Sequence, residues 1–279
     1  MYRKILAAVN EHLNSEVSAR YALNLARELG SKVYVCFIAT KNMSQHDRRA
    51  AEEALKRLFN EALDLGIQAE SIAGIGDPVK EISGIVRHEG IDLAFASTRR
   101  EDMEKRFFTG TVARSLSLKL PCSVALVRVV HAGRVHPKKI LVPLKARIDH
   151  VNERAAFVSH MAKTFRSKVF IFHAPRPFTR FFHGEIHLTQ SQWEERMSGD
   201  ISQFMERLGH HDIAHEGKLL PGRTARNITV EAFARRHDLI IMGSSRRSPW
   251  ASLIRGNPVE EVLRETPCDL IILTPRHED

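Results

Sequence analysis

The sequence predicts an α/β protein made of two tandem doubly wound sandwiches, each built on an open five-stranded parallel sheet. An internal repeat indicates the duplication, because residues 91–97 (IDLAFAS) return as residues 237–243 (HDLIIMG), 146 positions later. Three further landmarks repeat at that spacing. They are Gly76 and Gly222, Gly110 and Gly256, and Pro121-Cys122 and Pro267-Cys268. Four landmarks in one register indicate a copied domain, and each half has the commonest domain size.

Apolar runs alternate with segments of helical periodicity in the first half, which predicts the order β-α-β-α-β-α-β-α-β. The apolar runs are nearly continuous in Val, Ile, Leu and Ala, so we expect strands that are buried on both faces of a parallel sheet. Glycines end three of the helices, and Asp77-Pro78 begins one with an N-cap and a proline at the first helical position. The predicted strands are 3–9, 33–40, 67–73, 91–96 and 123–130, and the predicted helices are 15–29, 45–65, 78–88 and 109–118.

The second half repeats this order. Its predicted strands are 139–144, 168–174, 213–220, 238–243 and 269–274, and its predicted helices are 150–165, 190–208, 224–236 and 257–265. The short polar segment 131–137 is the predicted linker between domain 1–130 and domain 138–279. About ten extra residues fall within the aromatic segment 175–190. This segment is either a loop packed on the neighbouring domain or a lid over a ligand at the strand ends.

Composition restricts the class of protein without naming its chemistry. A chain of 279 residues lies where one core usually splits into two, and 43% hydrophobic with 27% charged residues is ordinary for globular proteins. No apolar run approaches the roughly 20 residues that span a bilayer, and no signal peptide is evident, so we expect a cytoplasmic protein without a membrane partner. The three cysteines lie in apolar runs, as in a reducing compartment. A net charge of +9 favours anionic ligands.

The segment after the fourth strand of each half carries the candidate site. It reads Ser97-Thr98-Arg99-Arg100, nine residues and Gly110-Thr111 in the first half. In the second half it reads Gly243-Ser244-Ser245-Arg246, nine residues and Gly256-Asn257. Ligands of open parallel sheets bind beyond the carboxyl ends of the strands. Glycines there let backbone N–H groups approach a phosphate, and the helix that follows points its positive end at it.

With these motifs the chain resembles the universal stress protein family over essentially its whole length, twice. The resemblance implies a Rossmann-like sandwich of the adenine nucleotide alpha hydrolase-like type. In nucleotide-binding members, strand four ends in GxxG, followed by nine residues and G[ST]. The implied nucleotide or anion site consists of Asn10, Ile38, Ser97, Arg100, Gly110 and Thr111 in the first half and Lys145, Ala174, Gly243, Ser244, Arg246, Gly256 and Asn257 in the second.

Several of these positions depart from the family pattern. The first glycine is Ser97 in one half and Gly243 in the other, and the second is an arginine in both, Arg100 and Arg246. These arginines either point outward and leave a vestigial pocket, or their guanidinium groups hold a phosphate or another anion in place of backbone donors. The second half is the stronger candidate for an anion site, since it keeps both Gly243 and Gly256.

The first and second strands also differ from the pattern. ATP-binding members place an aspartate at the end of strand one, where this chain has Asn10 and Lys145. Lys145 adds positive charge that favours an anion. Ile38 and Ala174 occupy the strand-two position whose backbone meets the base, and a backbone contact tolerates this change.

Three functional classes follow from this pattern. The first is a non-catalytic stress-response protein with degenerate nucleotide-binding loops that acts through ligand-dependent or dimer-dependent interactions. The second is an ATP-binding switch or slow ATPase that uses the second domain, and ATP or another phosphate-bearing ligand is its cofactor. A nucleic-acid binder is the third, and it is disfavoured because basic stretches lack interleaved aromatic residues. No motif pairs a nucleophile with a base.

Assembly and metal binding complete the predictions. The fifth strands, 123–130 and 269–274, are the edges through which family members commonly associate. We therefore expect the two domains to pair within one chain. Association of two whole chains into a homodimer is a second alternative. Two groups of histidines bear on metal binding, one by number alone and one, with Glu185, by a metal-like spacing that lacks a third ligand, and we expect no metal. They are His183 and His187, and His210, His211 and His215.

Overall fold

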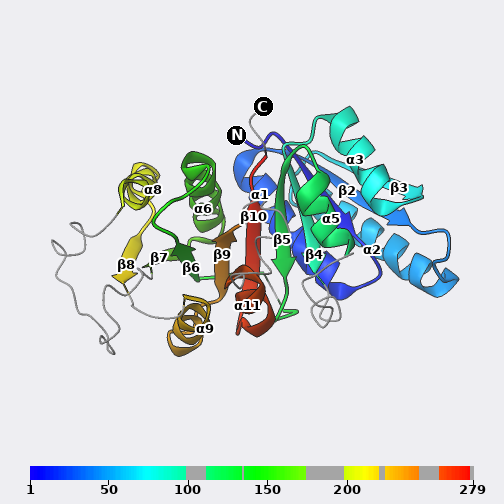
Figure 1. Cartoon of the computed structure of the whole chain (residues 1–279). Coiled ribbons are helices and arrows are strands. Elements are labelled where there is room, and N and C mark those ends of the chain that lie inside the picture. The colour runs from blue at the N-terminus through cyan, green and yellow to red at the C-terminus, as the bar shows by residue number, and fades with distance from the viewer. Residues whose placement is uncertain (99–110, 134, 174–197, 220–223, 245–257, 277–279) are drawn as a thin grey trace. The chain divides into compact units, whose positions relative to one another are not determined.

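The computed structural model describes residues 1–98, 111–133, 135–173, 198–219, 224–244 and 258–276 (Figure 1). The chain divides into two compact units, residues 1–135 with 272–279 and residues 136–271. One break of this division, between residues 135 and 136, lies in the segment 131–137, and residues 272–279, which the sequence assigns to domain 138–279, group with the first unit. Among the described residues, every helix is too short or too polar to cross a bilayer.

The first unit contains one parallel sheet in the order β3-β2-β1-β4-β5. Its strands are β1 (Lys4–Val9), β2 (Lys32–Ala39), β3 (Ala69–Ile75), β4 (Leu93–Thr98) and β5 (Ser123–Arg128), and its helices are α1 (Leu13–Leu29), α2 (Gln45–Asp64), α3 (Pro78–Glu89) and α5 (Val112–Lys119). Helices α1 and α2 pack together, as do α3 and α5. Because the order reverses between β1 and β4, the carboxyl ends of these two strands form a switch point.

The second half of the chain, which comprises the second unit and the end of β10, repeats this order as β8-β7-β6-β9-β10. Its strands are β6 (Lys139–Leu144), β7 (Lys168–His173), β8 (His215–Leu219), β9 (Leu239–Gly243) and β10 (Asp269–Thr274), and its helices are α6 (Val151–Phe165), α8 (Gly199–His210), α9 (Thr224–Ala234) and α11 (Pro258–Glu265). Figure 1 shows α6 and α8 on one face of this sheet and α9 and α11 on the other. The predicted fold class, doubly wound parallel sheets in tandem, is confirmed.

Buried strands explain why the prediction succeeds. The burial patterns of β2 and β10 are almost continuous, as expected for strands covered by helices on both faces. Tyr21 of α1 and Phe157 of α6 are fully buried at corresponding positions of the repeat. The same apolar pattern therefore builds both cores.

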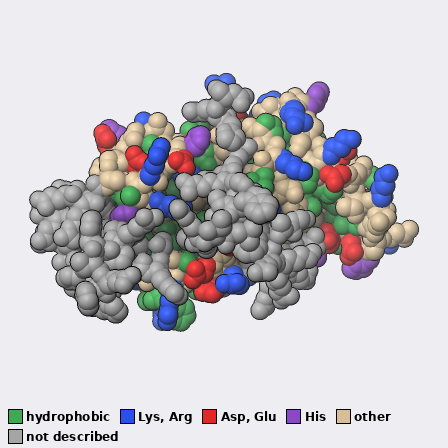
Figure 2. Space-filling model, viewed as in Figure 1, with side chains coloured by type: hydrophobic (Ala, Val, Ile, Leu, Met, Phe, Trp, Pro, Cys, Tyr) green, Lys and Arg blue, Asp and Glu red, His purple; other side chains and the backbone are tan. Residues whose placement is uncertain are grey.

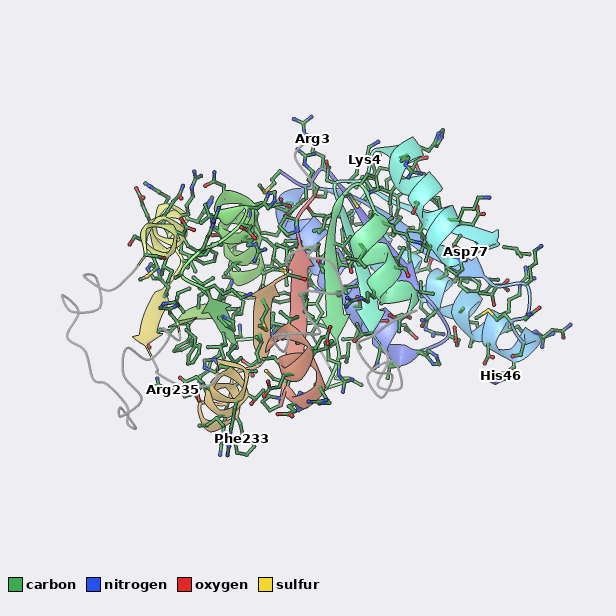
Figure 3. The ribbon with its side chains drawn as sticks, viewed as in Figure 1. Arg3, Lys4, His46, Asp77, Phe233 and Arg235 are labelled. Carbon is green, nitrogen blue, oxygen red and sulfur yellow. The ribbon has the colours of Figure 1, made fainter. Side chains whose placement is uncertain are left out.

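An aspartate before the fourth strand of each unit fixes the start of the first strand. The Asp92 carboxylate accepts the backbone N–H groups of Arg3 and Lys4 at 2.8 and 3.0 Å. Asp238 does the same for Lys138 and Lys139, at 2.8 Å each. Figure 3 shows Arg3 and Lys4 where β1 begins, at the end of the strand opposite the candidate site. These repeated aspartates are therefore structural.

Some element boundaries differ from the prediction because residues with the side chains of strand residues form part of a helix end instead. The sequence predicts a strand at 67–73, but β3 spans Ala69–Ile75. The backbone N–H of Ile67 bonds to the carbonyl of Ala62, which closes the last turn of α2, and Gly66 takes the left-handed conformation that this closure needs. Helix α1 begins at Leu13, two residues before its predicted start.

The two units differ at the ends of their helices. Gly30 and Gly90 follow α1 and α3 with φ of 64° and 65°. The corresponding residues of the second unit are Arg166 and Arg236, and each has φ of 52°. Left-handed backbone costs an L residue with a side chain roughly 1 kcal/mol. The second copy therefore carries strain that glycine removes from the first.

Candidate functional site

The candidate site lies at the carboxyl ends of the strands in each unit. Of the predicted residues, the structure describes Asn10, Ile38, Ser97 and Thr111 in the first unit and Lys145, Gly243 and Ser244 in the second. Arg100, Gly110, Ala174, Arg246, Gly256 and Asn257 lie outside the described residues, as does the aromatic segment 175–190. Strand β1 pairs with β4 and β6 pairs with β9. The residues that follow each pair therefore share one edge.

Asn10 uses its polar atoms to close the turn between β1 and α1. Its side-chain oxygen accepts the N–H of His12 at 3.0 Å, and its own N–H donates to Ser15 Oγ at 3.0 Å. The Ser15 hydroxyl lies 2.8 Å from the carbonyl of His12. This is an Asx turn that fixes the start of the helix. The residue in place of the family aspartate thus serves its own loop.

The other described positions of the first unit are also engaged locally. Ile38 is buried in β2, and its Cδ1 lies 3.0 Å from where a Cβ on Gly74 would be. The Thr111 side chain caps α5 by accepting the N–H of Arg114 at 3.3 Å. Ser97 is half-buried at the end of β4, and Thr98 beside it is fully buried. The hydroxyl predicted to bond a phosphate is thus also an N-cap.

The second unit has a half-buried arginine at this edge that the sequence did not indicate. Arg154 of α6 reaches the end of β9, where its Nη2 donates to the carbonyl oxygen of Ser244 at 2.9 Å. Its Nη1 lies 1.3 Å from where a Cβ on Gly243 would stand. Gly243 must therefore lack a side chain because the guanidinium occupies that space. In this structure the bare glycine accommodates Arg154.

The surroundings of Arg154 are unfavourable for its charge. Burial lowers the pKa of the guanidinium, and Asp149 and Glu153 offset this only through longer-range attraction. Among the described residues no carboxylate forms an ion pair with Arg154, and its Nε atom is buried without a hydrogen-bond partner. A guanidinium always carries its charge in proteins. Within the described residues the site therefore holds a positive charge that is only partly compensated.

The first unit has no such charge at the corresponding place. The repeat register of Ser31 and Ser167 aligns Arg154 with Ser18 of α1, which is fully buried. Gly243 and Ser244 align with Ser97 and Thr98. Comparison of the two helices residue by residue would have identified Arg154, because a buried helix position that holds serine in one copy holds arginine in the other.

The histidine groups form no metal centre within the parts of the chain that the structure describes. His210 lies 3.5 Å from Glu206 on the surface of α8, and His211 stacks obliquely near His160 with ring centroids 5.8 Å apart. His215 Nδ1 contacts the carbonyl of Ile213 at 2.8 Å. His183 and His187 lie outside the described residues.

The outer helices of the first unit form a separate groove. It has a volume of about 630 Å³ between α3 and α5 and is lined partly by the basic side chains of Lys80, Arg87 and Lys119. Asp77, which Figure 3 labels where α3 begins, caps this helix by accepting the N–H of Lys80 at 2.8 Å. On the face that Figure 2 shows, the described basic side chains are interspersed with acidic ones.

Comparison with known proteins identifies relatives of the chain in one protein family. A model of the universal stress protein family matches residues 1–128 and again residues 137–274. Universal stress protein YxiE of Bacillus subtilis is 26% identical over 148 residues, which cover 46% of this chain and 100% of that protein. A universal stress protein of Thermus aquaticus is 25% identical over 126 residues, covering 45% of this chain and 90% of its own.

A solved structure matches the chain over both halves. The crystal structure of a universal stress protein from Archaeoglobus fulgidus superposes with a TM-score of 0.68 at 18% identity and covers 99% of this chain and 97% of its own. At this identity the likeness concerns the fold, whereas the family model matches the sequence itself along most of its length. The chain therefore belongs to the universal stress protein family and carries two copies of the family domain in tandem.

Proposed function

We propose that the chain is a non-catalytic, cytoplasmic stress-response protein with degenerate nucleotide-binding loops. In this proposal it acts by binding a small anionic ligand at the second unit or by pairing of its domains. The observation that carries the proposal is that side chains of the chain itself occupy, at the carboxyl ends of the strands, the positions at which nucleotide-binding members contact their ligand. Asn10 closes the turn after β1, and Arg154 occupies the space above Gly243. In nucleotide-binding members these positions face the ligand. In this chain Asn10 stabilises its own turn, and the position of Gly243 accommodates the guanidinium group of Arg154.

A binding role without catalysis accounts for the polar groups at these ends. The hydroxyls of Ser15 and Thr111 bond to backbone groups of their own turns. The described hydrogen bonds of Ser15 are all to backbone groups, so they supply no histidine or carboxylate that could activate its hydroxyl. A positive charge near an anionic ligand supports binding without supplying a nucleophile. The rival function is an ATP-binding switch or slow ATPase that uses the second unit.

Calorimetric titration of the whole chain with ATP, ADP and AMP, each with and without magnesium, tests the proposal. We expect binding that depends on the phosphate groups but not on magnesium, and no release of phosphate from ATP over hours. Micromolar binding of ATP that requires magnesium, together with steady hydrolysis, would establish the rival. Failure of all three nucleotides to bind would leave domain pairing as the proposed mode of action.

The same proposal includes assembly and location. Pairing of the two domains through the predicted fifth strands, 123–130 and 269–274, remains a proposal, as does a homodimer of whole chains. Sedimentation analysis with and without the nucleotide that binds would determine whether two chains associate in a ligand-dependent way. The three free cysteines, Cys36, Cys122 and Cys268, are all buried, which is typical of proteins from a reducing compartment.

A further inference from the structure

Arg154 is costly for the second unit in the absence of a ligand. A buried charge is tolerated when an opposite charge or a full set of hydrogen bonds compensates it. Here the described contacts are the carbonyl of Ser244, which accepts one N–H group, and the face of Gly243. The Nε atom has no partner in the described structure. The donor capacity of the guanidinium is therefore only partly used.

The position of Arg154 coincides with the edge at which a parallel sheet binds ligands. Its guanidinium lies at the end of β9, and β6, whose end is followed by Lys145, is the neighbouring strand. Because β6 and β9 flank the point where the strand order reverses, their carboxyl ends form the edge at which parallel sheets bind ligands. Arg154 contacts the residue that follows β9, and Lys145 directly follows β6, so both strand ends of this switch point carry a positive charge nearby.

The first unit shows that the fold does not need this charge. Ser18 takes the position of Arg154 there, and Ser97 takes the position of Gly243. The second unit combines an arginine with the residue that leaves room for it. Arg154 fits only because Gly243 has no side chain, so the two residues depend on each other. This pairing indicates a function beyond packing, because an apolar side chain would fill the space without the cost of burying a charge.

We propose that Arg154 is the anion receptor of the second unit and binds an oxyanion, in particular the phosphate group of a small ligand. This proposal rests on the proposed function, in which the second unit binds an anionic ligand. A guanidinium offers a fork of N–H donors that matches two oxygens of a phosphate. Because Gly243 has no side chain, the guanidinium group fits against it. In nucleotide-binding members the corresponding glycine leaves the backbone exposed to the phosphate.

The test replaces Arg154 by the residue that the first unit has. Arg154→Ser, Arg154→Lys and the unchanged chain are titrated with inorganic phosphate, AMP and ATP, and sulfate serves as a second oxyanion. We expect Arg154→Ser to bind phosphate-bearing ligands about 10- to 100-fold more weakly, as for the loss of a charge-assisted hydrogen bond. Arg154→Lys keeps the charge but loses the fork, so its affinity should lie between the two. Arg207→Ser, which removes an exposed charge from α8, is the matched control and should bind normally.

Each result decides between the receptor and an arginine that merely fills the site. Stronger binding of ATP by Arg154→Ser would overturn the proposal, because it would mean that the side chain blocks the pocket. Unchanged binding by Arg154→Ser would overturn it too, while the proposed function would stand. If the unchanged chain binds none of these anions, both the receptor and the ligand-dependent function fail. Thermal unfolding checks folding, and we expect Arg154→Ser to be at least as stable as the unchanged chain without anion, since it removes a partly buried charge.

Discussion

His237 should make the second unit sensitive to acid, and replacement by isoleucine should remove that sensitivity. His237 is 4% exposed, and neither of its ring nitrogens has a hydrogen-bond partner in the described structure. Its ring meets that of Phe170 edge to face, with centroids 4.8 Å apart. In the first unit the corresponding residue is Ile91, which is equally buried. An apolar side chain therefore suits this position.

Burial lowers the pKa of His237 from 6.5 to about 4. This value includes the effects of nearby charges, since Glu231 and Asp238 raise the pKa and Lys139 and Arg235 lower it. Above pH 6.5 the ring is neutral in both the folded and the unfolded chain, so it has no effect on stability. Between pH 6.5 and about 4 only the unfolded chain takes up the proton, and stability falls as the pH falls. The loss reaches about 2 kcal/mol at pH 5.

Chemical denaturation followed by circular dichroism, repeated between pH 8 and pH 5, measures this contribution. The unchanged chain should lose about 2 kcal/mol more unfolding free energy over this range than His237→Ile. His160, whose pKa burial also lowers to about 4, is present in both chains and cancels from the difference. Parallel pH profiles for the two chains would refute the reasoning, because they would show that the folded protein protonates His237 without cost.

Three further predictions concern the differences between the two units. Arg236→Gly should raise the unfolding free energy of the second unit by about 1 kcal/mol in denaturant titrations, and Gly90→Arg should lower that of the first by a similar amount, since both positions have left-handed backbone. Gly243→Ala should cost about 1–3 kcal/mol and weaken phosphate binding, because its Cβ would displace the guanidinium of Arg154, whereas Ser97→Ala in the first unit should have little effect. In hydrogen exchange, buried amides of β6 and β9 should exchange faster than those of β1 and β4; equal rates would contradict the strain assigned to the second copy.

The fold could be predicted because its signals are local and repeated. Continuous apolar runs, glycines after helices and the pair Asp77-Pro78 each indicate an element from neighbouring residues alone, and the internal repeat doubles the evidence. The prediction erred where one residue can serve two elements. Ile67 has the side chain of a strand residue, yet its N–H closes the turn after α2. Backbone hydrogen bonds that end a helix are not visible in side-chain patterns.

The candidate site was only partly predictable. The sequence indicates which residues follow strand four, so it could identify Gly243 and Ser244. No motif marks Arg154, because that residue lies on α6 and meets Gly243 only through the tertiary fold; its one sequence signal is the difference from Ser18 between the two copies. The interpretation of Gly243 changes accordingly. A glycine in a sequence does not show whether the space beside it accommodates a ligand or a side chain from elsewhere in the chain.

The differences between the copies point in one direction. The first unit has serine, isoleucine and glycine at positions 18, 91 and 90. The second has a half-buried arginine, a buried histidine and an arginine with left-handed backbone at the corresponding positions. Among the described residues, each change in the second unit costs stability by a separate physical mechanism: a partly buried charge without an ion pair, an imidazole without a hydrogen bond, and a strained backbone. Residues that bind ligands commonly reduce the stability of the fold that carries them. The concentration of such residues in one copy is therefore what we expect if the first unit serves mainly as a scaffold and the second binds the ligand.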